Sequence, residues 1–411
     1  MKISWYLLLF GYITELMVIS CTIVEGKSEP DNLRDYYKPD KSISITYIDT
    51  ASFSLDSTAY IVSTDLDLNG KTIYLPQNCS IDFNKGSFSN GKIIGDSTII
   101  IYRGSRIFEN VEISGTWIAP CISTDMFAPE ERRTLEYISI LSANDIYNTI
   151  CINRDCIAPI KAWDSYFKIK SYTHLILNAD IYADFTSFKG GYVMAIDGNN
   201  ISINGNNHYL YGDINRQSSN RFEWLHGLVV YDNCRNVLIE NIKAYYFCGD
   251  GFGNRGSDII YRNIAAEYNG RQGLSITKGN NIIVENSTFK NTGRLETCNS
   301  GGPGAGIDIE PNKGDKVNNI TIQNCVLSDN HIYMENFTND LQVYNTFNSD
   351  ISIVNCSIGG LYFGKCSEVE VINCSGIKTV YGIDKKVRKI SLWQSGEPYL
   401  SKYIMQKVKI K

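Results

Sequence analysis

Residues 249–311 decide the fold of this chain. They read GDGFGNRGSDIIYRNIAAEYNGRQGLSITKGNNIIVENSTFKNTGRLETCNSGGPGAGIDIEP. The phrase (Ile/Val)-x-(Ile/Val/Tyr)-x-Asn recurs in this stretch, and a glycine-led phrase accompanies each copy: Gly-Asp-Gly, then Gly-Arg-Gln-Gly, then Gly-Ala-Gly-Ile-Asp-Ile-Glu. Apolar residues that alternate with polar ones predict strands, and a repeat of near-constant period predicts that the strands stack into a solenoid. We expect the glycine-led phrases to lie on one face of it.

The same phrase continues on both sides of this stretch. Asn241, Asn263 and Asn286 close successive copies 22 and 23 positions apart, and further copies end at Asn324, Asn355 and Asn373. This period predicts an all-β protein, a right-handed parallel β-helix over residues 125–380. Because asparagine amides in register can bond to one another, we expect an internal asparagine ladder at one turn.

Cysteines follow three of these asparagines. Cys325, Cys356 and Cys374 are expected to stack as a small apolar ladder within the solenoid. Cys151 and Cys156 are close enough in sequence for a local disulfide. Twelve cysteines in one chain suit an exported protein, because disulfides persist outside the cytosol.

The N-terminus has the pattern of an export signal. Lys2 is followed by an apolar run over residues 5–19, and Val-Ile-Ser-Cys ends it at Cys21. This ending predicts a lipidated Cys21 in segment 1–21, hence an outer-membrane or cell-surface lipoprotein, or a periplasmic protein. The alternative is an ordinary signal peptide with a chance cysteine. Polar residues 22–57 are expected to be a tether.

The remaining segments flank the repeat. Residues 58–124 alternate as short strands and predict an N-terminal β segment or cap. Residues 129–144 (PEERRTLEYISILSAN) predict a helix, with Pro129 in its first turn, that caps the solenoid. Residues 381–411 are expected to form a C-terminal cap.

The composition of the chain indicates which classes of partner it can bind. The 411 residues are 43% hydrophobic and 20% charged, which indicates a folded chain, and the net charge of −5 lacks the basic footprint of a nucleic-acid binder. The 27 tyrosines suit a sheet surface and also sugar recognition. We expect a monomer.

Two carboxylates stand out against the repeat. Asp308 and Glu310 alternate on one predicted strand, so both should point outward about 7 Å apart. Asp250 is expected outward about 12 Å away, two rungs along, with Arg271 at the edge of the same face. Like charges raise one pKa, so one carboxyl stays protonated while the other is ionised. Glycosidic hydrolysis needs this pair, and the wider spacing favours inversion.

Other residues are candidates for holding a sugar. His226 and Trp224 enter the neighbouring rung on the same side, and His226 is either a proton relay or a surface histidine bonded to backbone. Phe222, Trp224 and Phe252 are expected to stack on sugar rings. The alignment that points Phe252 outward matches Gly251–Gly253 with Leu274–Ile276. An insertion at residues 291–304 is expected to wall a groove.

The Gly-Asp-Gly, Gly-Arg-Gln-Gly and Ile-Asp-Ile-Glu-Pro phrases, with the asparagine turns, resemble the pectate-lyase-like superfamily of right-handed parallel β-helix proteins over residues 125–375. The resemblance implies binding or cleavage of a polysaccharide along one parallel sheet. The family's hydrolases carry Gly-Asp-Asp and Gly-His-Gly; this chain has Gly-Asp-Gly and lacks Gly-His-Gly, so only Asp250 matches. The family's lyases imply calcium held by Asp250, Asp308 and Glu310, with Arg271, Lys278 or Arg255 as base.

Three functions follow as expectations. The first is an exported hydrolase that uses Asp308 and Glu310 as its acid and base, with Asp250 assisting, no cofactor, and Arg271 and Lys278 among the substrate-binding residues. The second is a lyase that eliminates at a uronic acid with calcium. The third is a non-catalytic glycan-binding or surface structural protein.

Overall fold

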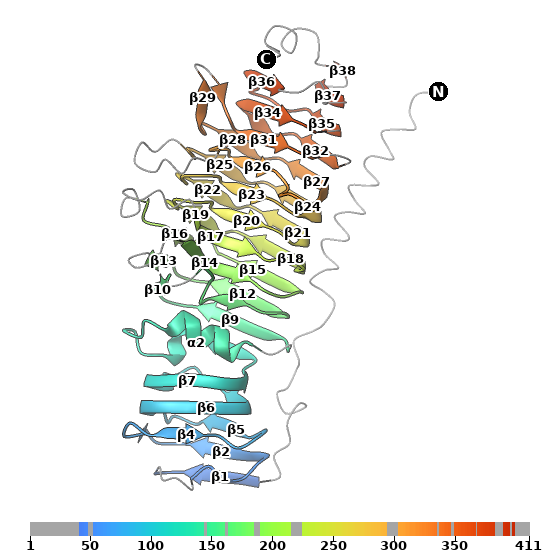
Figure 1. Ribbon diagram of the computed structural model, residues 1–411. Coiled ribbons are helices and arrows are strands. Elements are labelled where there is room, and N and C mark those ends of the chain that lie inside the picture. Colours follow the sequence, from blue (N-terminus) through green and yellow to red (C-terminus); the bar gives the residue numbers. More distant parts are fainter. Residues whose placement is uncertain are drawn as a thin grey trace.

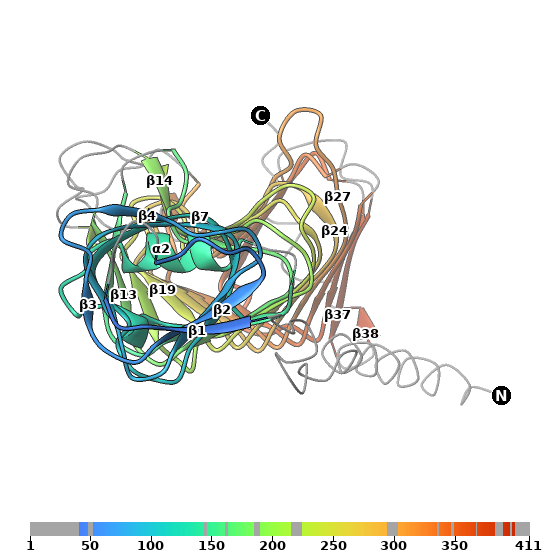
Figure 2. The ribbon, with the colours of Figure 1, turned by 90° about the horizontal axis from the view of Figure 1, so that it is seen from below.

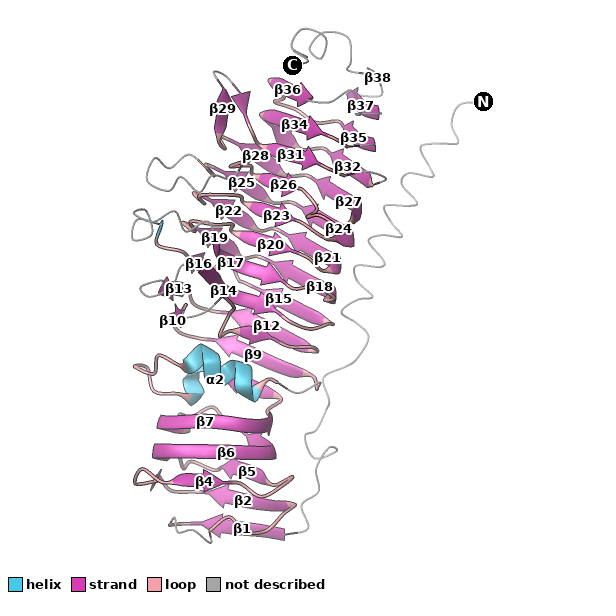
Figure 3. Ribbon diagram, in the orientation of Figure 1, coloured by secondary structure: helices cyan, strands magenta, loops and turns pink. Residues whose placement is uncertain are grey.

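Parallel β-sheets dominate the computed structural model, and Figure 3 shows a short α-helix beside the strands. The structure describes residues 41–47, 52–143, 146–160, 163–184, 190–214, 224–293, 303–334, 337–346, 349–366, 368–382, 389–394 and 397–398. Cys21, Phe222 and the centre of the 291–304 insertion lie outside these ranges.

The N-terminal part forms a seven-stranded parallel sheet. Its strands are β1 (Lys41–Ile45), β2 (Thr58–Val62), β3 (Leu66–Asp67), β4 (Thr72–Tyr74), β5 (Ser80–Phe83), β6 (Phe88–Ile101) and β7 (Phe108–Ile118). Strand β1 pairs with β2 in parallel, although its residues fall in the expected tether. The tether prediction is therefore wrong for residues 41–45, whose short alternating pattern adds an edge strand.

The helix is shorter than the sequence predicts. A 3-10 turn, η2, spans Thr124–Met126, and α2 spans Thr134–Leu141. Pro129 lies in a turn ahead of the helix, where the Thr134 hydroxyl donates to the Glu131 carbonyl. The apolar side of α2 packs against β7 and the first strands of the larger sheets. Figure 1 shows α2 between β7 and β9 (Asn148–Ile152), and Figure 2 shows it lying across the coil, so it separates the N-terminal sheet from the three larger sheets.

Beyond α2 the chain visits three sheets in turn. The twelve-stranded sheet has, in spatial order, β8 (Cys121–Ser123), β9 (Asn148–Ile152), β12 (Thr173–Leu177), β15 (Ile201–Asn204), β18 (Arg235–Glu240), β21 (Ser257–Arg262), β24 (Gly279–Glu285), β27 (Val317–Gln323), β32 (Asp350–Val354), β35 (Glu368–Ile372), β37 (Lys389–Gln394) and β38 (Glu397–Pro398). The eight-stranded sheet has β10 (Cys156–Pro159), β13 (Ile181–Asp184), β16 (Tyr209–Tyr211), β19 (Lys243–Tyr245), β22 (Ala265–Glu267), β25 (Thr288–Lys290), β28 (Val326–Ser328) and β33 (Ser357–Ile358).

The nine-stranded sheet completes each passage. It has β11 (Lys168–Ile169), β14 (Gly190–Ile196), β17 (Trp224–Val230), β20 (Phe252–Asn254), β23 (Leu274–Ile276), β26 (Ile307–Ile309), β31 (Leu341–Tyr344), β34 (Gly360–Gly364) and β36 (Thr379–Gly382). A rung is one passage through the three sheets, for example β18, β19 and β20. The described strands pair in parallel except β29 (Ile332–Met334) with β30 (Phe337–Thr338), and β37 with β38.

The predicted repeat is confirmed strand by strand. Val237 pairs with Ile259, and Ile259 with Ile282, and the same register continues to β35. These apolar side chains form ladders in the interior, where they are almost fully buried. Burial of stacked aliphatic rows is the main stabilising term of such a fold.

The asparagine ladder exists, but it lies on the surface rather than inside. Asn263 donates to Asn241 at 2.6 Å and Asn324 donates to Asn286 at 3.3 Å. Each closes its strand in the left-handed conformation, with φ of 50° at Asn263 and 53° at Asn286, and this sharp turn directs the side chain outward. Asn263, Asn286 and Asn324 are exposed.

The cysteine ladder is confirmed. The Cys325 and Cys356 amides donate to the sulfurs of Cys356 and Cys374, and all three side chains are buried. Cys151 and Cys156 are both free thiols, so the predicted local disulfide is wrong: they occupy different strands, β9 and β10, that belong to different sheets. No helix in the described part of the chain has the length and apolarity needed to span a membrane.

Candidate active site

Glycines allow successive rungs to pack closely just before the strands of the nine-stranded sheet. At Gly251 an added Cβ would press on Asn269 and the Gly273 backbone, and at Gly273 it would press on Phe289 and the Gly306 backbone. Successive rungs therefore approach each other too closely there for any larger residue. The residues just before these glycines, Asp250 and Gln272, are held beside one another.

The predicted alignment is wrong by one residue at Phe252. Phe252 pairs with Leu274, and Gly253, not Phe252, pairs with Ser275. Ile259 follows Asn254 by five positions, whereas Ile282 follows Ile276 by six, so counting back from the asparagines misplaces the strand. A slip of one residue reverses the face of every side chain. Phe252 is fully buried in the core, which excludes the predicted stacking on a sugar.

Asp250 lies at the centre of one part of the site. Its carboxylate accepts from Arg271 Nη1 at 3.2 Å and from the Gln272 amide at 3.2 Å. Its own amide donates to His226 Nδ1 at 2.7 Å. His226 is buried, not on the surface, and it is the backbone-bonded histidine of the two alternatives. Because Nδ1 accepts, the proton of the neutral ring is on Nε2.

Gln272 connects Asp250 to the predicted pair. Its side-chain Nε2 donates to Asp308 Oδ2 at 3.0 Å, while its backbone amide binds Asp250. Asp308 belongs to β26 and pairs with Ser275 on one side and Gln342 on the other. Asp308 alternates with the core residues Ile307 and Ile309, as predicted, but it is only 3% exposed, so neighbouring groups cover it. Its Oδ1 atom and Gln272 Oε1 are buried and have no hydrogen-bond partner.

Glu310 is the more accessible carboxylate. It follows β26, is partly exposed and accepts from Gln342 Nε2 at 3.3 Å. Asn339 supports that glutamine, because its side-chain amide donates to Gln342 Oε1 at 3.1 Å and to the Pro303 carbonyl at 3.2 Å. The described end of the 291–304 insertion thus contacts the site, whereas residues 294–302 lie outside the described ranges.

Burial controls the protonation of these groups. It raises the pKa of Asp308 to about 8, with the nearby charge of Glu310 as the second cause. It raises the pKa of Asp250 to about 6 against the opposing effect of Arg271, and it also raises the pKa of Glu310. Burial and Arg271 lower the pKa of His226 to about 3, so its 3.5 Å approach to Asp250 is not an ion pair at neutral pH. We call Asp250, Asp308 and Glu310 the acid cluster.

Small residues adjoin Asp308 on its sheet. Ser275 is its neighbour in register, and Gly253 is next. A Cβ added at Gly253 would meet only the Val229 side chain, at 3.4 Å or more, so the outer face is open there. A ligand above Gly253 would have Gln272 and Asp250 on one side and the Asp308 strand at its end.

Trp224 and Arg271 border the acid cluster. Trp224 is 47% exposed, and the Arg271 guanidinium lies 5.5 Å from the centre of its ring. His226 packs edge-on against Trp224 and is stacked on Tyr192. The structure therefore brings together five of the candidate residues: Asp250, Asp308, Arg271, His226 and Trp224.

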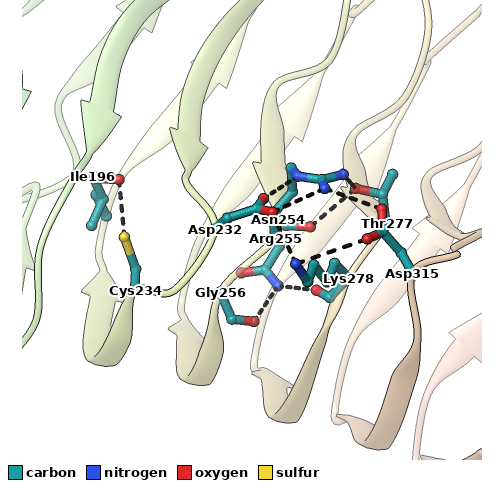
Figure 4. Close-up of polar contacts among 9 residues, drawn as sticks. All are labelled: Ile196, Asp232, Cys234, Asn254, Arg255, Gly256, Thr277, Lys278 and Asp315. Carbon is teal, nitrogen blue, oxygen red and sulfur yellow. Dashed lines mark hydrogen bonds and ion pairs between the residues drawn. The ribbon is translucent and has the colours of Figure 1, made fainter. Parts of the chain in front are cut away.

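Lys278 belongs to a second group, just beyond the ends of β17, β20 and β23, shown in Figure 4. Its ammonium lies 2.9 Å from Asp232 and 3.8 Å from Asp315. Arg255 binds the same two carboxylates and donates to Thr277. We call Asp232, Arg255, Lys278 and Asp315 the ion cluster. Both cations are engaged with carboxylates there, which does not favour Lys278 as a substrate ligand or either cation as a base.

The acid cluster does not fit calcium. Within the described residues, which include all three carboxylates, no three His, Cys, Asp or Glu side chains are grouped so that they could hold a metal ion. A calcium site needs six to eight oxygens around one centre. The expected calcium cage of Asp250, Asp308 and Glu310 is therefore wrong.

Sequence reasoning missed Gln272 and Gln342. Both amides bind the carboxylates of the acid cluster, but glutamine on a sheet surface is unremarkable without neighbours. One signal was available: Gln272 precedes the second glycine of Gly-Arg-Gln-Gly just as Asp250 precedes the second glycine of Gly-Asp-Gly.

Comparison with known proteins adds one distant structure. No family model matches the chain, and no curated protein matches it. Among solved structures, the chain is similar to the crystal structure of an alginate lyase from Paenibacillus sp. str. FPU-7, at 11% sequence identity and a TM-score of 0.29. The match covers 87% of this chain and 98% of the other.

Proposed function

We propose that this protein is a right-handed parallel β-helix enzyme that cleaves a polysaccharide by hydrolysis, with Asp308 as general acid and Glu310 as general base. One observation carries the proposal: Asp308 in β26 and Glu310 directly after β26 lie two positions apart, and burial raises the pKa of Asp308 to about 8 beside the more exposed Glu310. Glycosidic hydrolysis requires one protonated and one ionised carboxyl.

In this mechanism each group has a defined task. Asp308 gives its proton to the oxygen of the leaving sugar, and Glu310 takes a proton from the attacking water. Arg271, held by Asp250, binds an anionic or hydroxyl substituent of the sugar. Trp224 offers an exposed ring for stacking on a sugar. Alternate positions on a strand are about 7 Å apart, which matches the wider spacing of inverting enzymes.

Elimination at a uronic acid is the second candidate. Arg271 favours it, because its charge lowers the pKa of both Asp308 and Glu310 and is placed to offset a substrate carboxylate in the same way. A lyase of this kind would use the site without the calcium cage.

Variants of the two carboxyls test the proposal. Asp308→Asn and Glu310→Gln should each lower the release of reducing ends from a panel of polysaccharides by about a hundredfold or more. Asp315→Asn, which removes a carboxylate of the ion cluster, is the matched control and should retain activity. Products with an unsaturated chromophore would establish elimination instead. Unchanged cleavage by both variants would reject the site, and binding without cleavage by the wild type would identify a glycan-binding protein.

Export and lipid anchoring through Cys21 remain part of this proposal, since residues 1–40 lie outside the described ranges. Many polysaccharides are extracellular polymers, and an anchored enzyme would meet them at the cell surface. Incorporation of a labelled fatty acid into the wild type, and its loss in Cys21→Ala, is the expected result; equal labelling of both would remove the anchor from the proposal.

A further inference from the structure

Six tyrosines gather on the outer face of the eight-stranded sheet, away from the candidate active site. They come from four successive strands, β13, β16, β19 and β22, or from the residue that follows the strand. These strands run up one side of the stack in Figure 1. We call them the tyrosine surface: Tyr182, Tyr209, Tyr211, Tyr245, Tyr246 and Tyr268.

The rings form one connected series. Tyr182 stacks on Tyr211 with ring centres 5.2 Å apart, and Tyr246 stacks on Tyr268 at the same separation. Tyr245 joins the two halves through edge-on contacts. Among the described rings, Tyr182 and Tyr268 each have one face that no other ring of the series stacks upon. Tyr182 is 40% exposed and Tyr268 is partly exposed.

Stability alone does not account for Tyr268. It adopts the left-handed conformation, with φ of 57°, at a position that the next two rungs fill with Asn291 and Asp329. Asparagine and aspartate tolerate this conformation, whereas a bulky residue is strained in it. The energetic cost of this strain is comparable with the stabilisation that one aromatic stacking contact contributes. Tyr246 is strained in the same way but packs against buried Ile214 and Cys248, so Tyr268 is the clearer case.

Hydrogen bonding and charge indicate the partner. The hydroxyls of Tyr211 and Tyr268 make no hydrogen bond within the described part of the chain. The bordering charges are already engaged: Lys243 donates to the Tyr209 hydroxyl at 3.3 Å, and Glu267 is hydrogen-bonded to Tyr245. Asp180 accepts from the Tyr209 amide at 2.9 Å and from the Tyr182 hydroxyl at 3.5 Å. Because each of these three charges has a partner within the protein, the surface matches an uncharged ligand that offers hydroxyls and C–H faces.

We propose that the tyrosine surface binds a polysaccharide chain at a second site, separate from the acid cluster. The sugar C–H faces pack on the free faces of Tyr182 and Tyr268, and the sugar hydroxyls bond to the free phenols. Such a site holds one part of the polysaccharide against the protein while another part of the same polysaccharide reaches the acid cluster. The choice of a polysaccharide as ligand rests on the proposed function. The evidence that the tyrosine surface is a binding site comes from the ring geometry and does not depend on that function.

Retardation in native gels that contain one of three uncharged polymers, galactomannan, xylan or β-glucan, tests the proposal. The experiment uses the full chain with Asp308→Asn, so that cleavage does not remove the polymer. At least one polymer should retard this protein, and adding Tyr182→Thr and Tyr268→Asn should weaken the affinity about tenfold. Tyr74→Thr, which removes a tyrosine that is 70% exposed on the N-terminal sheet, is the matched control and should have no effect.

Two results would overturn the proposal: no retardation by any of the three polymers, or equal retardation after both tyrosines are replaced. Melting temperatures should stay equal, because Asn suits the left-handed position of residue 268. If the double variant unfolds, Tyr182→Thr alone must still weaken retardation about threefold. Loss of cleavage in Asp308→Asn does not enter these readouts, so failure of this site and failure of the proposed enzyme are separate outcomes.

Discussion

The acid cluster and the ion cluster both lie beside strands of the nine-stranded sheet, but their carboxylates have opposite environments. In the acid cluster, Asp250 and Asp308 are each 3% exposed, and Arg271 donates a hydrogen bond to Asp250. In the ion cluster, two cations serve two carboxylates, and the Asp232 side chain is 38% exposed. Burial raises the pKa of Asp308 to about 8, whereas the hydrogen bond from Arg255 lowers the pKa of Asp232 to about 2.

This difference shows where chemistry is available on a repetitive sheet. A compensated ion pair contributes to stability and keeps its charges fixed. A buried carboxyl without its own cation stays protonated near neutral pH and can give that proton away. Four predictions test the comparison.

The largest expected effect is on stability in Asp308→Asn. Between pH 4 and pH 8 the unfolded chain releases the Asp308 proton while the folded protein keeps it, so the wild-type free energy of unfolding falls as pH rises. The variant lacks this fall. From pH 4 to pH 8, the unfolding free energy of the variant should therefore rise, relative to that of the wild type, by on the order of 3–5 kcal/mol. Denaturant unfolding at both pH values measures it. Parallel curves would contradict the raised pKa.

The second prediction concerns the pH profile of polysaccharide cleavage. The rate should fall above about pH 8 as Asp308 loses its proton. Arg271 lowers the pKa of Asp308, so Arg271→Met should move this limb to higher pH by about one unit. Lys278→Met removes a cation from the ion cluster and should leave the limb in place. Equal shifts in both variants would mean that the two clusters are not electrically distinct.

The third prediction applies to Arg255→Met, which leaves Asp232 and Asp315 without their shared guanidinium. The cost should be about 1–2 kcal/mol of unfolding free energy, moderated because the cluster is partly exposed. Asp232 has a lowered pKa, so the wild type loses stability as pH falls from 4 toward 2, and the variant should show a shallower loss. Chemical denaturation across this range gives both numbers.

The smallest effect is expected for Lys278→Met. Its ammonium makes one close contact, to Asp232, and one at 3.8 Å, in a side chain that is 35% exposed. A loss of about 0.5 kcal/mol is expected, and it should vanish in high salt because exposed charges are screened. A loss of unfolding free energy larger than that of Arg255→Met would show that Lys278, rather than Arg255, contributes most of the stability of the ion cluster.

Some parts of the structure were readable in the linear pattern. The strands β18 to β35 follow from alternating Ile and Val before each asparagine, because inward and outward residues alternate along a strand. Asp250, Arg271 and Asp308 are assigned to one site on the same grounds. The pattern did not reveal that a turn after Asn254 is one residue shorter than the turn after Ile276, which reverses the face of Phe252.

The sequence by itself determined the repeat, the buried rows and the short list of carboxylates, because these depend on local alternation and spacing. Only the tertiary structure decided that Asp308 is covered, that Gln272 joins it to Asp250, and that Lys278 is bound to Asp232. Burial and pairing depend on neighbours 22 to 46 positions away, as in the contacts of Asp250, Asp308 and Lys278. Protonation follows from those neighbours rather than from residue type.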